Sequence, residues 1–130
     1  MRHKRILVID DEKDFTKMIK TSLETRGEYK VRTQNIPSRA IDTIRTFKPD
    51  LILLDIMMPG GINGDEIARR IKDDEEIKDI PIVFLTAMLT EKEVAERDSI
   101  IGGYPFIAKP VKIEELIDYI EKTLTKEKEA

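Results

Sequence analysis

The segment DLILLDIMMPGG, residues 50–61, determines which fold the chain can adopt. Its apolar side chains at 51–54 lead directly into Asp55, and two methionines, a proline and two glycines follow. A short apolar run bounded by turn residues is typical of a strand that is buried on both faces of a parallel sheet. Because an unpaired carboxylate is costly inside a core, we expect the strand to deliver Asp55 into a crevice at the edge of the sheet.

Short apolar runs of the same kind alternate with helical patterns along the rest of the chain. The predicted strands are 6–9, 29–33, 51–54, 81–85 and 105–108, with 29–33 near an edge. Apolar residues recur with the spacing of one helix face in four other segments: Phe15, Met18, Ile19, Ser22 and Leu23; Ala40, Ile41, Ile44 and Phe47; Ile67, Ala68 and Ile71; and Ile113, Leu116, Ile117, Ile120 and Leu124. The segment 73–79 is rich in charge and is predicted to be a solvated loop.

Capping residues predict where the helices begin and end. Asp14 is placed to cap the start of the first helix, and Gly27 stands where a C-terminal cap belongs. Pro37 suits the first turn of the second helix, and the third helix follows Gly64. A capping box at 90–93 predicts a further short helix. Five alternating β–α units therefore predict a parallel sheet with helices on both faces, a doubly wound α/β sandwich.

Composition limits the classes of protein to consider. The 130 residues predict one domain, 1–130, whose charged tail from about residue 125 is expected to fray. The net charge is −3 and the basic residues are scattered, so direct nucleic-acid binding is not expected. Without cysteine there is no disulfide or thiolate zinc site. The first apolar run is too short for a signal peptide or a membrane span, which predicts a cytoplasmic protein.

Polar residues end four of the five predicted strands. They are Asp10 and Asp11 in the first, Asp55 in the third, Thr86 in the fourth and Lys109 in the fifth. Parallel strands bring these ends to one edge, where doubly wound folds bind ligands. Two carboxylates about 4 Å apart repel by roughly 4 kcal/mol at an intermediate dielectric, so cations must be present. Lys109 supplies one, and oxygen ligands without His or Cys suit Mg²⁺.

Such a site is organised to hold a phosphoryl group, and a neighbouring carboxylate could accept it as an aspartyl-phosphate. The stretches ILVIDDE, LILLDIMMPG, VFLTA and FIAKP resemble the signature stretches of the response-regulator receiver domain of two-component signalling. The resemblance runs in order through essentially the whole chain. It implies a (βα)5 flavodoxin-like sandwich whose parallel sheet has the strand order 2-1-3-4-5.

The resemblance also assigns roles in the metal and phosphoryl site. Asp55 matches the phospho-accepting aspartate, Asp11 the direct Mg²⁺ ligand and Asp10 the ligand that acts mainly through water. Met57 would offer its backbone carbonyl to the metal, and Lys109 would pair with a phosphoryl oxygen. The implied cofactor is Mg²⁺, with Mn²⁺ as an alternative.

A second group of residues matches the switch of the family. Thr86 would hydrogen-bond the phosphoryl group beside the small Ala87, and Phe106 holds the aromatic switch position, for which Tyr104 competes. Pro110 would follow a cis peptide bond. Phosphorylation would then reshape the face made by the fourth helix, fifth strand and fifth helix.

The resemblance implies partners as well. A sensor histidine kinase or a phosphotransfer protein would supply the phosphoryl group, and an unidentified downstream protein would read the result. The chain would act on its own phosphorylation and dephosphorylation only, and is not expected to be an enzyme.

The chain departs from the family pattern in three places, and other functions stay open. MPGGING has one residue more than the usual loop between Asp55 and Gly64, Pro105 lies in or just before the fifth strand, and no output domain is expected to follow. An aspartate-nucleophile phosphatase would carry a second Asp where Met57 stands. A flavin-binding domain would need a hydroxyl-rich loop after the first strand. A receiver-like interaction module that is never phosphorylated is the remaining alternative.

Overall fold

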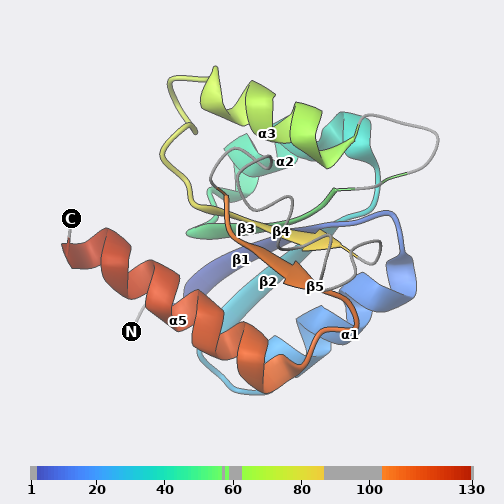
Figure 1. The fold of residues 1–130 in the computed structure, drawn as a ribbon, viewed down its shortest axis with the longest axis vertical. Helices are drawn as coiled ribbons and strands as arrows, with labels where there is room; N and C mark the ends of the chain where they lie inside the picture. Colours follow the sequence, from blue (N-terminus) through green and yellow to red (C-terminus); the bar gives the residue numbers. More distant parts are fainter. Residues whose placement is uncertain (1–2, 57, 59–62, 87–103, 130) are drawn as a thin grey trace.

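A parallel five-stranded sheet in the order β2-β1-β3-β4-β5 forms the centre of the molecule (Figure 1). The computed structural model describes residues 3–56, 58, 63–86 and 104–129. The strands are β1 (Lys4–Ile9), β2 (Tyr29–Gln34), β3 (Leu51–Asp55), β4 (Ile82–Thr86) and β5 (Phe106–Ala108). The predicted doubly wound sheet and its strand order are confirmed, with β2 and β5 as the edge strands.

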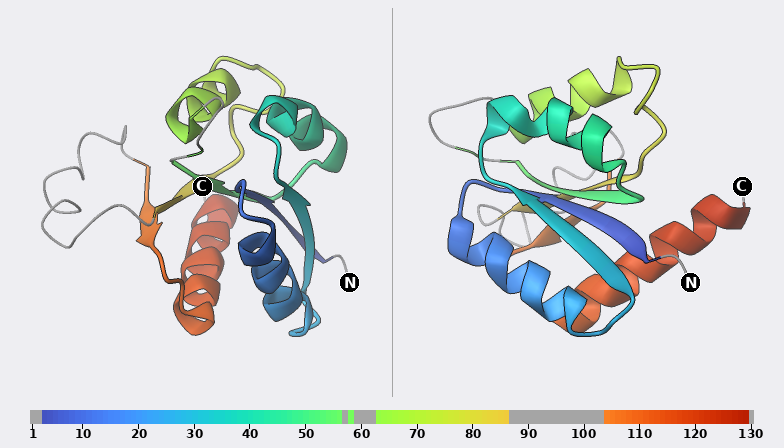
Figure 2. Two further views of the ribbon diagram at one scale, coloured as in Figure 1. Left: turned by 90° about the vertical axis from the view of Figure 1, so that its right-hand side faces the viewer. Right: turned by 180° about the vertical axis from the view of Figure 1, so that it is seen from behind.

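Helices cover both faces of the sheet, as Figures 1 and 2 show. The α-helices are α1 (Lys13–Glu24), α2 (Ala40–Phe47), α3 (Gly64–Lys72) and α5 (Ile113–Glu129), and a 3₁₀ helix, η1 (Pro37–Arg39), precedes α2. α1 and α5 lie on one face, and α2 and α3 on the other. α5 continues to Glu129, further than the expected fraying from about residue 125. The helix predicted from the capping box at 90–93 lies outside the described residues.

The central strand β3 is buried because it has a neighbour on each edge and a helix layer on each face. It pairs with β1 and β4 in parallel register. Ile52 and Leu54 pack into the core beneath α2 and α3, whereas Leu51 and Leu53 pack toward α1 and α5. Each of these side chains is fully buried, and burial of that kind contributes roughly 1.5–3 kcal/mol per residue.

The predicted inner face of α1 is buried at Ile19 and Leu23 but not at Met18. Met18 is 41% exposed, and Thr16 is 1% exposed and takes its place in the interior. Threonine can be buried there because its hydroxyl donates to the Lys13 carbonyl and accepts a hydrogen bond from Asn35. Asp14 lies within the first turn of α1, and no side-chain cap forms at its start, so the predicted cap is wrong.

Backbone conformation ends two of the helices. Gly27, just after α1, has φ +80°, which fits the predicted role of glycine in ending that helix. Lys48 ends α2 with φ 53°, a left-handed backbone conformation that a lysine in the sequence does not predict. In the predicted solvated loop 73–79, Ile77 is buried in the core beneath α2 and α3, so only its charged neighbours are solvated.

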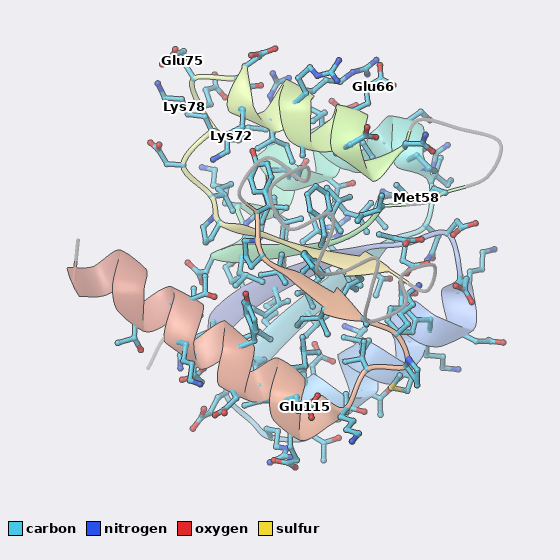
Figure 3. The ribbon with its side chains drawn as sticks, viewed as in Figure 1. Met58, Glu66, Lys72, Glu75, Lys78 and Glu115 are labelled. Carbon is cyan, nitrogen blue, oxygen red and sulfur yellow. The ribbon has the colours of Figure 1, made fainter. Side chains whose placement is uncertain are left out.

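Charged side chains lie on the outer surface of both helix layers (Figure 3). Glu66 and Glu75 lie at the outer surface on the α3 side, and Glu115 is exposed on α5. Met58, by contrast, packs between the sheet and α3. Within the described part of the chain, no helix combines the length and the apolar character needed to cross a bilayer.

Candidate functional site

Adjacent strand ends bring three carboxylates together. β1 and β3 pair so that Ile9 lies opposite Leu54, which places Asp10 and Asp11 beside Asp55. One carboxylate oxygen from each of the three residues lies within 4.8 Å of the others. Asp10 and Asp55 are buried, at 0% and 4% exposed, and Asp11 is half-buried. Topology thus assembles the predicted acidic cluster from segments far apart in sequence.

Lys109 reaches this cluster from the end of β5. Its Nζ lies 2.6 Å from Asp10 Oδ2 and 4.0 Å from Asp55 Oδ2, and the side chain is 9% exposed. Two contacts of Lys109 were not predicted: Glu12 Oε1 lies 3.2 Å from Nζ, and the Phe15 ring centroid lies 4.2 Å from it. The ammonium therefore sits on the Asp10 side of the cluster, between carboxylates and an aromatic face.

Burial and charge act in opposite directions on these groups. Burial raises the pKa of Asp10 above its ordinary value, and the hydrogen bonds from Lys109 and the Glu12 amide oppose this without cancelling it. Burial alone would lower the pKa of Lys109, but the hydrogen bond to Asp10 and the charges of Asp10 and Asp55 outweigh it and raise that pKa. Lys109 therefore only partly offsets the cost of burying the Asp10 carboxylate.

Asp10 should make the metal-free protein less stable as the pH rises. The folded-state pKa of Asp10 is raised, so between the unfolded and folded pKa values the folded protein binds a proton at Asp10 more readily than the unfolded chain does. Its stabilising contribution is complete below the unfolded pKa and is lost as the pH rises through the folded pKa. In urea unfolding without divalent metal, the free energy of unfolding of wild type should fall relative to that of Asp10→Asn as the pH rises from about 4 to neutral. The same pH dependence in both proteins would contradict this.

Gly64 touches the backbone of Asp55, a contact that the sequence does not reveal. The Gly64 amide donates to the Ile56 carbonyl at 2.9 Å. A Cβ built on Gly64 would lie 2.1 Å from the Asp55 carbonyl oxygen. The sequence places Gly64 only at a helix start, whereas here it allows α3 to approach the strand that carries Asp55.

The other predicted site residues fall into two groups. Thr86 ends β4 opposite Ala108, and its side chain, like Met57 and Ala87, lies outside the described residues. Phe106 is half-buried and packs on the core beneath α2 and α3. Tyr104 contacts the same core and meets the Phe84 ring edge to face at 5.4 Å.

Two expected features flank β5. Pro105 precedes the strand, where its carbonyl accepts a hydrogen bond from Phe84, as a proline at a strand start can do. The peptide bond between Lys109 and Pro110 is cis, as the sequence resemblance implies. Most of the loop with the extra residue after Asp55 lies outside the described residues.

Comparison with known proteins identifies the class. Residues 6–121 match the response regulator receiver domain, and the chain belongs to this family. It is therefore a receiver domain of the kind found in two-component response regulators. Two solved structures are similar: the signal receiver domain of a DNA-binding response regulator from Colwellia psychrerythraea (TM-score 0.78, 31% identity, 93% of this chain and 98% of that one), and the N-terminal domain of a response regulator receiver protein from Methanoculleus marisnigri (TM-score 0.67, 38% identity, 91% and 94%).

Curated relatives differ in length. The chain is 40% identical over 121 residues to the phosphate regulon transcriptional regulatory protein PhoB of Pseudomonas aeruginosa, covering 93% of this chain and 52% of PhoB. It is 31% identical to the polar-differentiation response regulator DivK of Brucella anthropi, covering 93% of this chain and 96% of DivK. The chain thus spans about half of the first relative and nearly all of the second.

The donor atoms at the site fit a hard divalent cation. Asp10, Asp11 and Asp55 offer only carboxylate oxygens, and these lie close enough together to hold a metal ion. Oxygen ligands without nitrogen or sulfur favour Mg²⁺, Mn²⁺ or Ca²⁺ over softer metals.

Proposed function

We propose that this receiver domain accepts a phosphoryl group on Asp55 from the phosphohistidine of a sensor histidine kinase or a phosphotransfer protein, and that Asp10, Asp11 and Asp55 bind Mg²⁺ for this step. One observation carries the proposal: the Asp55 carboxylate lies in the same small cluster as two further carboxylates and 4.0 Å from the Lys109 ammonium. When bound, Mg²⁺ would neutralise negative charge on the phosphoryl group and orient it for transfer.

Asp55 would act as the nucleophile. A carboxylate oxygen attacks phosphorus, the new O–P bond forms, and the P–N bond to histidine breaks with the electron pair leaving on nitrogen. A carboxylate nucleophile needs no general base, because it attacks without losing a proton. Rigid placement at the end of a buried strand contributes by positioning the nucleophile.

Lys109 would shift its interactions when the phosphoryl group arrives. It now hydrogen-bonds Asp10 at 2.6 Å and has Asp55 at 4.0 Å, so a small movement of the long side chain brings Nζ to an oxygen on Asp55. A phosphoryl group carries about two negative charges and so attracts this ammonium more strongly than one carboxylate does.

Phosphorylation of Asp55 would change the protein surface through residues of β4 and β5. In this proposal the Thr86 hydroxyl turns toward the phosphoryl group, and Phe106 fills the space that this movement leaves. The face containing β5 and α5 would change shape and bind a downstream protein. The domain would catalyse only its own phosphorylation and dephosphorylation, in the cytoplasm, and would not act as an enzyme on other substrates.

Intact-mass measurement after incubation with acetyl phosphate and Mg²⁺ tests the proposal. Wild type is expected to gain one phosphoryl group, and Asp55→Asn and a chelator-treated sample none. Asp65→Asn, which removes an exposed carboxylate from the first turn of α3, is the matched control and should behave as wild type. Wild type without the added mass would favour an unphosphorylated interaction module, and steady turnover of a phosphate ester would favour a phosphatase.

A further inference from the structure

Asn35 connects three parts of the molecule around the acidic pair. It stands directly after β2, and its side-chain Nδ2 donates to the Asp10 carbonyl at 2.7 Å and to Thr16 Oγ1 at 3.0 Å. Thr16 lies in α1 and its hydroxyl donates to the Lys13 carbonyl. One amide group thus joins the end of β2, the loop after β1 and the first turns of α1.

The direction of the Asp10 carbonyl affects how Asp10 and Asp11 are placed in the site. It belongs to the same planar peptide unit as the Asp11 amide, so its direction fixes the rotation of the link between the two acids. The Asp10 amide is held by the Gln34 carbonyl at 3.1 Å, and Asp10 Oδ1 accepts from the Glu12 amide at 2.9 Å. Asn35 supplies the third restraint, on the carbonyl.

The neighbouring residue Gln34 connects the same turn to α2. The Gln34 side chain donates to Thr43 Oγ1 at 2.7 Å and accepts from the Ile36 amide at 3.0 Å. Thr43 is a buried residue of α2. The turn after β2 is thus joined to α2 through Gln34 and, by a separate hydrogen bond, to the acidic loop through Asn35.

We infer that Asn35 is a positioning residue for the divalent cation, acting through the Asp10 carbonyl to hold Asp10 and Asp11 in a metal-binding arrangement. This inference rests on the proposed function, since it assumes that these acids bind Mg²⁺. Asn35 does not touch the cation; it fixes the peptide that carries two of its ligands. Residues that orient metal ligands in this way are worth 10-fold or more in affinity in many sites.

Calorimetric titration with Mg²⁺ tests the inference on wild type, Asn35→Ala and Thr43→Val. Asn35→Ala should bind Mg²⁺ about tenfold more weakly than wild type. Thr43→Val removes a hydrogen bond of the same turn without touching Asp10, so it should lower stability while leaving Mg²⁺ affinity unchanged. Equal Mg²⁺ affinity in Asn35→Ala and wild type, or an equal loss in both variants, would overturn the inference.

Amide hydrogen exchange in the metal-free proteins separates this inference from the proposed function. The Glu12 amide, bonded to Asp10 Oδ1, should exchange faster in Asn35→Ala than in wild type or Thr43→Val. Unchanged exchange would overturn the inference whatever the metal does. If wild type does not bind Mg²⁺ at all, the proposed function fails, and with it the assignment of Asn35 to the metal.

Discussion

Replacing Gly64 with alanine is expected to destabilise the protein by about 3 kcal/mol or more and to displace Asp55. The added methyl group would lie 2.1 Å from the Asp55 carbonyl oxygen and 2.9 Å from the Ile56 Cα. Both are backbone atoms of β3 or of the residue after it, so no side-chain rotation can relieve the contact. Overpacking of a rigid interior costs 1–3 kcal/mol in ordinary cases and more when backbone must move.

Gly27→Ala is the matched control. Gly27 has φ +80°, and a Cβ built on it meets no atom within 4 Å. The substitution therefore introduces conformational strain of about 1 kcal/mol and no collision. Urea unfolding should show a much larger loss for Gly64→Ala than for Gly27→Ala. Similar losses would mean that α3 can move away from β3, and that Gly64 does not fix the position of Asp55.

The pattern of apolar runs was sufficient to predict the sheet, because each buried strand contains a continuous or alternating apolar sequence. β3 is the clearest case, since four fully buried side chains precede Asp55. The acidic cluster was predictable for a related reason: parallel strands present their carboxyl ends at one edge, so Asp10, Asp11 and Asp55 had to be close once the strands were assigned.

Hydrogen bonds between residues far apart in sequence could not be predicted from the pattern of apolar runs. Asn35 lies in a turn, and only the fold brings its amide to the Asp10 carbonyl and Thr16. The same contact allows Thr16 to be buried in α1, which apolar periodicity could not predict; that pattern assigned the exposed Met18 inward. The hydrogen bonds to Lys13 and Asn35 satisfy the Thr16 hydroxyl, so this polar side chain can be buried.

Replacing Lys109 with methionine is expected to destabilise the metal-free protein by about 3 kcal/mol at pH 8. The side chain is 9% exposed and its hydrogen-bonded partner Asp10 is fully buried, so the variant leaves a buried carboxylate without its cation. Removal of one member of a buried ion pair costs about 3–5 kcal/mol.

The pH dependence of this loss provides the sharper test. Without Lys109, one influence that lowers the pKa of Asp10 disappears, so acidification should protonate Asp10 and reduce the difference from wild type. The pKa of Lys109 is raised in the folded protein, so wild type loses the stabilising contribution of the ammonium as the pH rises through that folded-state pKa. The difference in stability between Lys109→Met and wild type should therefore shrink again at high pH. Urea unfolding should therefore show the greatest loss of stability in Lys109→Met, relative to wild type, at intermediate pH.

Lys122→Met, at an exposed i,i+4 pair with Asp118, is the control and should change the free energy of unfolding by less than about 0.5 kcal/mol at every pH. A loss for Lys109→Met that does not vary with pH would show that packing of the side chain, and not its charge beside Asp10 and Asp55, stabilises the site.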